Sequence, residues 1–299
     1  MNNMQLSAFL IKELLKNGVE EFCLCTGARN ASLIITLEKN KNIKTYHFFD
    51  ERSAAFFALG RIHQTRKPVA VITTSGTAVA EVLPATIEAY YSGLPLIIIT
   101  ADRPKSYRQT GAPQAIEQIG IFSHYTKQNF DLDTNEFNIE KLDLSISVPI
   151  HINVCFDEPL VDAEAIFIDE IQFQKQELKS ENYDQTDDSI EILNDFLSQF
   201  FPLVLIGGLN SSDRQSVLEF LSQCPYPIYV ETISGLKNHP DLKNELLVPE
   251  KTAKLLLKER QCDAILRIGS IPTTRLWRDL ESSFKETPVL SLTETGFSG

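Results

Sequence analysis

Charged and small polar residues follow four short apolar runs in the first half of the chain. They are Gly27-Ala28-Arg29-Asn30, Asp50-Glu51-Arg52, Ser75-Gly76-Thr77 and Ala101-Asp102-Arg103-Pro104. In an open parallel sheet, the carboxyl ends of the strands lie along one edge, where ligands bind. If the apolar runs are parallel strands, this edge collects a carboxylate, two arginines and a glycine-containing turn. The sequence therefore predicts a ligand site there.

Glu51 stands between HFFD and the apolar, alanine-rich segment SAAFFALG, at the expected start of a helix. A partly buried carboxylate at this position is a candidate proton-transfer group. The alternative is a helix N-terminal carboxylate that the helix macrodipole favours. The position of Glu51 alone favours the helix N-terminal role.

The other candidates at this edge are suited to binding anions or to local structure. Arg29 and Arg103 have the fork geometry that recognises carboxylates, and the alternative for each is an ion pair with a neighbouring acid. Ser75 and Thr77 lie at a helix entry, where a hydroxyl caps backbone N–H groups, and Gly76 permits close approach of a ligand. The segment lacks the lysine of a P-loop and the GxGxxG pattern, which disfavours a nucleotide phosphate site.

Short apolar runs alternate with helical patterns along the chain, as is typical of βαβ units around a parallel sheet. In the first half, strands are expected at 21–26, 44–49, 68–74, 94–100, 126–130 and 148–154. Helices are expected near 5–17, 30–39, 52–65, 77–91 and 136–146.

A polar, acidic linker at 166–187 separates a first domain, 1–165, from a second, 188–299. In the second domain, strands are expected at 201–208, 226–231, 263–269 and 288–292, and helices near 188–199, after Ser211 and near 249–260. The fold class is therefore α/β, with two three-layer, parallel-sheet domains. The turn IGGLNSSD, 206–213, resembles a dinucleotide-binding turn only loosely.

The composition excludes several classes of protein. The 299 residues include 28 Lys and Arg and 40 Asp and Glu, and the net charge of −12 argues against binding to nucleic acid or an anionic membrane. The N-terminal segment has no signal-peptide core, and the apolar runs are far shorter than the roughly 20 residues that cross a bilayer. We therefore expect a cytoplasmic protein with no membrane span. The five scattered cysteines are expected to be buried, reduced thiols.

Four ordered segments resemble thiamine-diphosphate enzymes: HFFDERSAAFFALG, VITTSGTAVAEVLPATIEA, LIIITADRP and GAPQAIEQIGIF. More closely, the chain resembles the MenD family, the 2-succinyl-5-enolpyruvyl-6-hydroxy-3-cyclohexene-1-carboxylate synthases, and RIGSIPTTRLWRDLE extends this resemblance through the second domain. It implies a pyrimidine-binding domain followed by a Rossmann-like central domain. The C-terminal diphosphate-binding domain of the family, with its GDG-type magnesium motif, has no counterpart here. The chain therefore looks like a fragment, and no metal ligand is expected within it.

The resemblance implies a transferase of menaquinone biosynthesis that uses thiamine diphosphate and Mg²⁺. Such enzymes decarboxylate 2-oxoglutarate and add the succinyl semialdehyde unit to isochorismate, with the cofactor as electron sink. Glu51 matches the family glutamate that hydrogen-bonds N1′ of the aminopyrimidine and thereby promotes loss of the thiazolium C2 proton. Ser75, Gly76 and Thr77 match the loop beside the pyrimidine, with helix capping as the alternative for the two hydroxyls.

By the same resemblance, Arg29, Arg103 and Gln114 match substrate-binding positions, because guanidinium forks and an amide orient carboxylates and hydroxyls. The chain departs from the family pattern at two places. The family turn Gly-Ser-Arg-Ser reads Gly27-Ala28-Arg29-Asn30 here, and Pro113 replaces the amide of a GANQAI-like segment. Each departure removes a polar contact that would reach substrate.

The family's cofactor site combines the glutamate of one subunit with the diphosphate site of the facing subunit, which implies a homodimer or homotetramer. We therefore expect the isolated chain to be inactive. One alternative is another 2-oxo-acid carboligase of the same superfamily, such as an acetolactate-synthase-like protein. Another is a non-catalytic scaffold or regulatory protein that kept the fold. The TADRP and GAPQAI segments favour the MenD family over another carboligase. Retention of Glu51 argues against a non-catalytic scaffold.

Overall fold

The computed structural model describes residues 1–139, 142–143, 148–168, 187–242 and 244–293. The chain divides into two compact units, Met1–Glu181 and Asn182–Gly299, and each is described by itself. The predicted linker, 166–187, lies almost wholly outside the described residues, so its limits stay a prediction.

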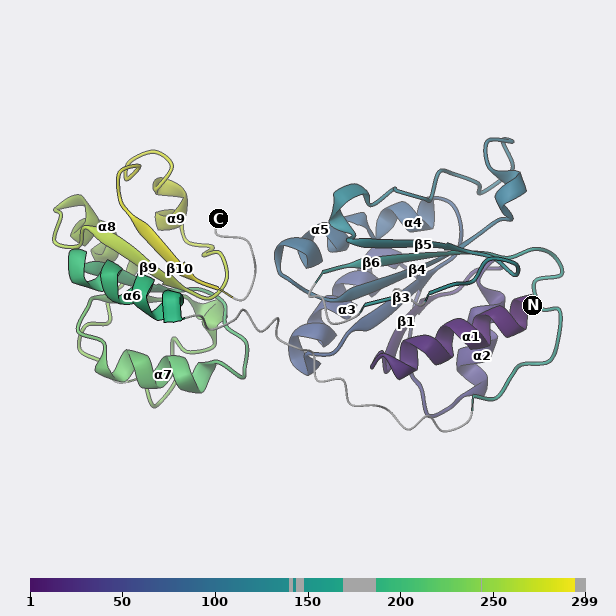
Figure 1. Cartoon of the computed structure of the whole chain (residues 1–299), viewed down its shortest axis with the longest axis horizontal. Coiled ribbons are helices and arrows are strands. Elements are labelled where there is room, and N and C mark those ends of the chain that lie inside the picture. The colour runs from purple at the N-terminus through teal and green to yellow at the C-terminus, as the bar shows by residue number, and fades with distance from the viewer. Residues whose placement is uncertain (140–141, 144–147, 169–186, 243, 294–299) are drawn as a thin grey trace. The chain divides into compact units, whose positions relative to one another are not determined.

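The first unit is built on a six-stranded parallel sheet with the order β2-β1-β3-β4-β6-β5. Figure 1 shows these strands side by side. Their bounds are β1 Glu21–Cys25, β2 Lys44–Phe48, β3 Val69–Thr73, β4 Leu96–Asp102, β5 Gln128–Leu132 and β6 Ile150–Cys155. All six expected strands are present, because each combines an apolar run with flanking turn residues.

Helices cover both faces of this sheet. They are α1 Asn3–Lys16, α2 Ala31–Lys39, α3 Glu51–Thr65, α4 Thr77–Glu81 and α5 Leu83–Tyr91, with short 3₁₀ turns at Lys105–Tyr107 and Ser123–Tyr125. The apolar core with α1 and α2 contains Ile97 and Ile99 of β4, whereas the core with α3, α4 and α5 contains Ile98. This alternation follows from the two-residue period of a strand. The unit therefore has the predicted three layers.

Two predictions about helices in the first unit differ from the structure. The single helix expected at 77–91 is divided into α4 and α5 at Val82. Pro84 lies in the first turn of α5, where a backbone N–H would have no partner within the helix, so proline is tolerated there. The helix expected at 136–146 is absent from its described residues, 136–139 and 142–143, and the rest lies outside the described part of the chain. Before it, the Asp133 carboxylate accepts the backbone N–H groups of Asn135 and Glu136, which favours a turn.

The second unit contains a four-stranded parallel sheet with the order β10-β9-β7-β8. Its elements are α6 Asp187–Gln199, β7 Pro202–Ile206, α7 Arg214–Gln223, β8 Ile228–Val230, a 3₁₀ turn at Thr232–Ser234, α8 Glu250–Lys258, β9 Ala264–Ile268, α9 Arg275–Asp279 and β10 Val289–Leu292. Side chains of α6 and α7 pack on one face of the sheet and those of α8 and α9 on the other. The predicted parallel-sheet α/β fold class is thus confirmed for both units, although sequence reasoning missed the short helix α9.

The burial of the cysteines agrees with the sequence analysis. All five cysteines are free and buried, at positions 23, 25, 155, 224 and 262. Among the described residues, no helix combines the length and apolar character needed to cross a bilayer.

Candidate functional site

The carboxyl edge of the first sheet contains a topological switch point between β1 and β3. The chain leaves β1 through α2 towards β2 on one side, and it leaves β3 through α4 and α5 towards β4 on the other. Connections that diverge in this way leave a crevice where ligands bind in open α/β sheets. Three of the four segments singled out in the sequence follow strands that end at this edge, and the fourth begins with Ala101 and Asp102, the last two residues of β4.

Glu51 is the first residue of α3 and is partly buried, as expected. The preceding residue, Asp50, caps the helix by accepting the Ser53 backbone N–H at 2.7 Å. Burial raises the pKa of the Cys25 thiol to about 12, and the nearby charge of Glu51 adds to that rise. The Glu51 carboxylate is therefore close enough to the end of β1 for its charge to act there. It makes no hydrogen bond or ion pair with another described residue, so it stays available to a ligand.

Arg29 is buried, with 8% of its surface exposed, and contacts the segment that follows β6. One terminal nitrogen donates to the Phe156 carbonyl at 3.0 Å, and the other lies 3.5 Å from the Glu158 carboxylate. The alternative of an ion pair with an acid is therefore the arrangement in the structure.

Asn30, the departure next to Arg29, has a structural role in the turn after β1. Its Oδ1 accepts the Gly27 N–H at 2.9 Å and its Nδ2 donates to the Cys25 carbonyl at 2.8 Å. The side chain is fully buried. Asn30 therefore satisfies two backbone groups that have left the sheet ladder.

Ser75 and Gly76 are buried and Thr77 is exposed. Gly76 is the N-cap residue of α4, and no side-chain hydrogen bond caps this helix, so the predicted capping role of the two hydroxyls is not realised. The φ angle of Gly76 is +85°, which residues with a Cβ rarely adopt. The backbone of Gln114 packs against it: a Cβ at position 76 would lie 3.3 Å from Gln114 Cα.

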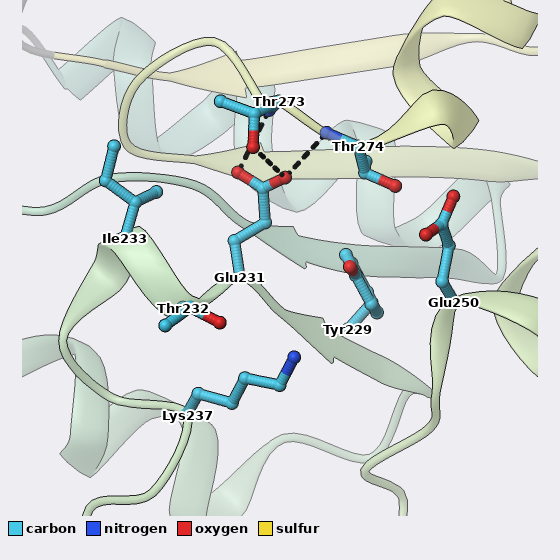
Figure 2. Close-up of a pocket in the computed structure, with 8 residues that line it drawn as sticks. All are labelled: Tyr229, Glu231, Thr232, Ile233, Lys237, Glu250, Thr273 and Thr274. Carbon is cyan, nitrogen blue, oxygen red and sulfur yellow. Dashed lines mark hydrogen bonds between the residues drawn. The ribbon is translucent and has the colours of Figure 1, made fainter.

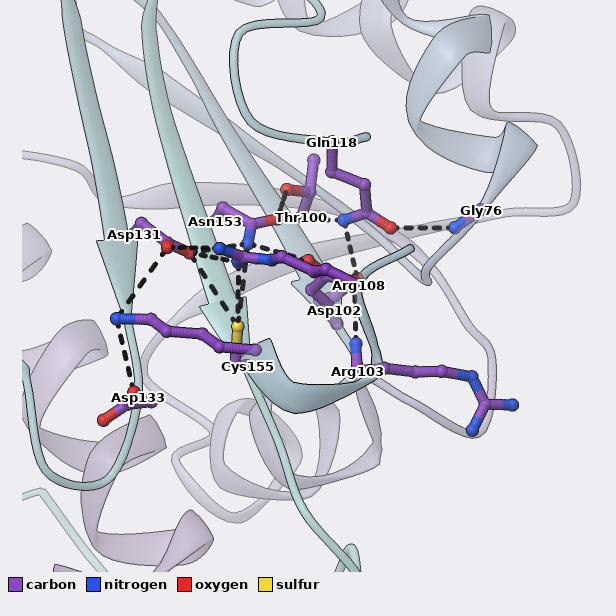
Figure 3. Close-up of polar contacts among 12 residues, drawn as sticks. Gly76, Thr100, Asp102, Arg103, Arg108, Gln118, Asp131, Asp133, Asn153 and Cys155 are labelled. Atoms are coloured by element: carbon purple, nitrogen blue, oxygen red, sulfur yellow. Dashed lines mark hydrogen bonds and ion pairs between the residues drawn. The ribbon is translucent and has the colours of Figure 1, made fainter. Parts of the chain in front are cut away.

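Arg103 lies beside this turn on the segment after β4. Its Nε donates to the Pro113 carbonyl at 2.6 Å, and its guanidinium lies 5.7 Å from the centre of the Tyr107 ring. The two terminal nitrogens make no hydrogen bond to other described residues, and Figure 3 shows this end of Arg103 pointing away from the polar cluster. The structure thus brings Arg103, Gln114 and the Gly76 turn together, and Pro113 contributes its carbonyl to the arrangement.

Sequence reasoning missed a polar network beneath this loop (Figure 3). Asn153 is at its centre: its Nδ2 donates to Asp102 at 3.1 Å and to Asp131 at 3.0 Å, and its Oδ1 accepts from Thr100 and Gln118. The signal was present in the strands, because the polar residues of LIIITAD and IHINVC alternate with apolar ones and so share one face of the sheet.

Arg108 offsets part of the negative charge of this network. Its two terminal nitrogens contact the Asp131 carboxylate at 2.8 and 2.7 Å, and one lies 3.5 Å from Asp102. Burial raises the pKa of Asp102, although hydrogen bonds from Asn153 and Arg108 oppose the rise. At Asp131 burial also acts to raise the pKa, but hydrogen bonds from Arg108 and Asn153 outweigh it and lower the pKa.

The second unit has a pocket of about 550 Å³ at the end of β8, lined by Tyr229, Glu231, Thr232, Ile233, Lys237, Glu250, Thr273 and Thr274 (Figure 2). Glu231 is 4% exposed, and its carboxylate accepts the backbone N–H groups of Thr273 and Thr274 at 3.1 and 2.7 Å. This carboxylate therefore holds two loops together rather than facing a ligand.

The loosely dinucleotide-like turn after β7 is packed against another loop. The Gly208 carbonyl accepts the Ser270 N–H at 2.9 Å, and a Cβ at Gly269 would lie 2.4 Å from the same oxygen. The backbone of this turn is thus in close contact with the backbone of the loop after β9. Among the described residues of both units, no three His, Cys, Asp or Glu side chains are grouped as metal ligands.

Comparison with known proteins places these features in context. Residues 4–121 match the family described as "Thiamine pyrophosphate enzyme, N-terminal TPP binding domain". The 2-succinyl-5-enolpyruvyl-6-hydroxy-3-cyclohexene-1-carboxylate synthase of Bdellovibrio bacteriovorus is 49% identical over 301 residues, covering 100% of this chain and 57% of that protein.

Two further relatives carry the same name. The Akkermansia muciniphila protein is 39% identical over 303 residues, covering 99% of this chain and 55% of that protein. The Staphylococcus epidermidis protein is 35% identical over 246 residues, covering 77% of this chain and 44% of that protein. The chain therefore spans about half the length of the curated relatives it matches.

Proposed function

The chain belongs to the 2-succinyl-5-enolpyruvyl-6-hydroxy-3-cyclohexene-1-carboxylate synthase family of thiamine pyrophosphate enzymes, and we propose that it contributes the pyrimidine side of that enzyme's active site. The whole protein would decarboxylate 2-oxoglutarate and add the resulting four-carbon unit to isochorismate. The observation that carries this proposal is the Glu51 carboxylate at the switch-point edge, in a chain whose segment 4–121 matches the cofactor-binding family.

Glu51 fits the aminopyrimidine of thiamine diphosphate. Its carboxylate is partly buried, lies by the end of β1 and has no competing partner among the described residues, whereas the adjacent Asp50 caps α3. Glu51 would hold a hydrogen bond to N1′ of the ring, and the buried Ser75 and Gly76 would form the wall beside it. When bound, the cofactor supplies the nucleophilic carbon and the electron sink for decarboxylation. Mg²⁺ and the diphosphate would be held outside this chain.

Arg103 and Gln114 are suited to the two anionic substrates. Arg103 keeps the fork end of its guanidinium unpaired, and Gln114 is exposed beside the Gly76 turn. A guanidinium fork recognises a carboxylate through two parallel hydrogen bonds, so Arg103 would orient a substrate carboxylate. Arg29 would join them by exchanging its 3.5 Å contact with Glu158, whose side chain is 73% exposed, for a substrate oxygen.

A second copy of the subunit is the proposed partner. Phe49 is fully exposed next to Glu51, and Phe56 on the outer side of α3 is 45% exposed. Exposed aromatic side chains close to a site are typical of protein interfaces. Covering them in a homodimer or homotetramer would also exclude water from the Glu51 carboxylate.

The test uses the whole protein that contains this chain, with thiamine diphosphate, Mg²⁺, 2-oxoglutarate and isochorismate. We expect the wild type to form the adduct and Glu51→Gln to lose at least 100-fold in kcat, because general acid–base groups contribute about 10²–10⁴-fold. Glu38→Gln, which changes an exposed carboxylate of α2, is the matched control and should stay within twofold. Decarboxylation without adduct would indicate another 2-oxo-acid carboligase, and absence of cofactor binding would indicate a scaffold.

A further inference from the structure

The loop 103–122 carries Arg103 and Gln114 but has little regular structure to hold it. Its described secondary structure is the 3₁₀ turn Lys105–Tyr107, so the loop has no strand ladder. Gln118 differs from its surroundings, because it is 1% exposed while its neighbours Glu117 and Ile119 are exposed. A buried amide needs hydrogen-bond partners, and these partners show what the side chain does.

The Gln118 amide contacts three segments at the carboxyl edge (Figure 3). Its Oε1 accepts the Gly76 N–H at 2.9 Å. Its Nε2 donates to the Ala101 carbonyl at 3.2 Å and to Asn153 Oδ1 at 2.9 Å. The acceptor and both donors of the amide are thereby used, which fixes the orientation of the side chain.

These contacts set the positions of the two proposed substrate residues. Gly76, which Gln118 binds, is also the residue against which the Gln114 backbone packs. The Pro113 carbonyl, one residue earlier, accepts from Arg103 Nε at 2.6 Å. A loop that loses Gln118 would therefore let Gln114 and Arg103 move together, away from the turn before α4.

We propose that Gln118 is a positioning residue for substrate binding, which fixes the loop carrying Arg103 and Gln114 without touching substrate. The inference rests on the proposed function, because only that function gives those two residues a substrate. Glu51 lies on α3 and is held by the Asp50 cap and helix packing. Loss of Gln118 should therefore weaken substrate binding more than cofactor binding, because it loosens Gly76 beside the pyrimidine but leaves the Glu51 contact in place. A general support of the fold would affect both equally.

The first test measures the loop itself, by amide hydrogen exchange on the 299-residue chain. Gln118→Met preserves side-chain length and removes all three hydrogen bonds; Glu117→Gln is the matched control on the exposed neighbour. We expect the Gly76 amide and peptides from 111–122 to exchange at least tenfold faster in Gln118→Met and to be unchanged in Glu117→Gln. Exchange that stays at the wild-type rate in both variants overturns the proposal.

The second test uses the whole protein and separates KM from kcat. For Gln118→Met we expect the KM of at least one of the two substrates to rise tenfold or more, with kcat and the Kd of thiamine diphosphate within threefold of wild type. Unchanged KM values, or an equal loss of cofactor affinity, contradict a positioning role. If the wild type forms no product, the proposed function is wrong. The hydrogen-exchange measurement then still tests whether Gln118 anchors the loop.

Gln118→Glu adds a test of pH dependence. It also serves as a second variant if Gln118→Met does not fold. An ionised carboxylate cannot donate to Ala101 or Asn153, whereas a protonated one regains one of those two hydrogen bonds. Its KM relative to wild type should therefore fall as the pH is lowered from 8 to 6. A ratio that is independent of pH overturns the proposed hydrogen-bonding role.

Discussion

We predict that His151 makes the first unit less stable in mild acid. It is fully buried on β6, with its ring 4.8 Å from that of Phe122. Because Thr100 donates its only hydroxyl proton to Asn153, it must accept from His151 Nε2, which lies 2.8 Å away. His151 is then neutral with its proton on Nε2, and its Nδ1 has no hydrogen-bond partner among the described residues.

Protonation of Nδ1 would place a charge where nothing accepts it. Burial therefore lowers the pKa of His151 from 6.5 to about 4. Between these values the unfolded chain binds the proton and the folded unit does not, so the free energy of unfolding falls as the pH falls. From pH 7 to pH 5 the loss is about 2 kcal/mol, at about 1.4 kcal/mol per pH unit below 6.5. Carboxylates such as Glu21, whose pKa Arg61 lowers to about 2, lose their contribution only below pH 4.5.

The assay is urea unfolding of the chain followed by circular dichroism at pH 7, 6 and 5. The only tryptophan, Trp277, lies in the second unit, so its fluorescence identifies the transition that belongs there. His151→Gln removes the titrating group and should make the loss between pH 7 and 5 smaller by about 2 kcal/mol. His63→Gln is measured beside it, because burial also lowers the pKa of His63. Equal pH dependence in wild type and His151→Gln, or a folded-state pKa near 6.5 by NMR, would refute the reasoning.

Three further outcomes follow from the carboxyl edge. Gly76→Ala should lower the free energy of unfolding by about 1–3 kcal/mol, because φ +85° is strained for alanine. Gly60→Ala should not lower it, because a Cβ at position 60 meets nothing within 4 Å. Equal effects of the two substitutions in urea titrations would contradict this prediction. Asn30→Ala should cost about 1–3 kcal/mol by leaving the buried Cys25 carbonyl unsatisfied, and an unchanged urea midpoint would contradict that. The isolated chain with thiamine diphosphate, Mg²⁺ and 2-oxoglutarate should release no CO₂ above background, and clear turnover would show that it needs no further domain.

The sheet of the first unit could be predicted because each strand carries its own signal. Apolar runs such as VAVIT and LIIIT, bounded by turn residues, are local features of the sequence. Their ends fix the carboxyl edge, so the residues that follow β1 to β4 could be placed before any coordinates were known. The helix boundary at Val82 was missed because a proline is also compatible with the first turn of a new helix.

The contacts at the site could not be predicted, because they join residues that are distant in sequence. Arg29 binds the Phe156 carbonyl across 127 positions, and Gln118 binds Gly76 across 42. Spacing along the chain contains no information on such pairs until the strand order is known. The sequence could therefore identify Arg29 as a candidate but could not show that its guanidinium is already engaged.

Backbone groups that leave the sheet ladder explain the buried amide side chains at the carboxyl edge of the first sheet. Where a parallel strand ends, its last backbone groups leave the ladder and need new partners. Asn30 and Gln118 supply them in the first unit. In the second unit, Glu231 instead accepts the N–H groups of Thr273 and Thr274, which lie just before α9. An apolar residue at position 30 or 118 would leave buried backbone groups unsatisfied, and water reaching them would loosen the loops. Buried amides and carboxylates at this edge thus mark which loops are held in one position, and in the first unit that loop carries Arg103 and Gln114.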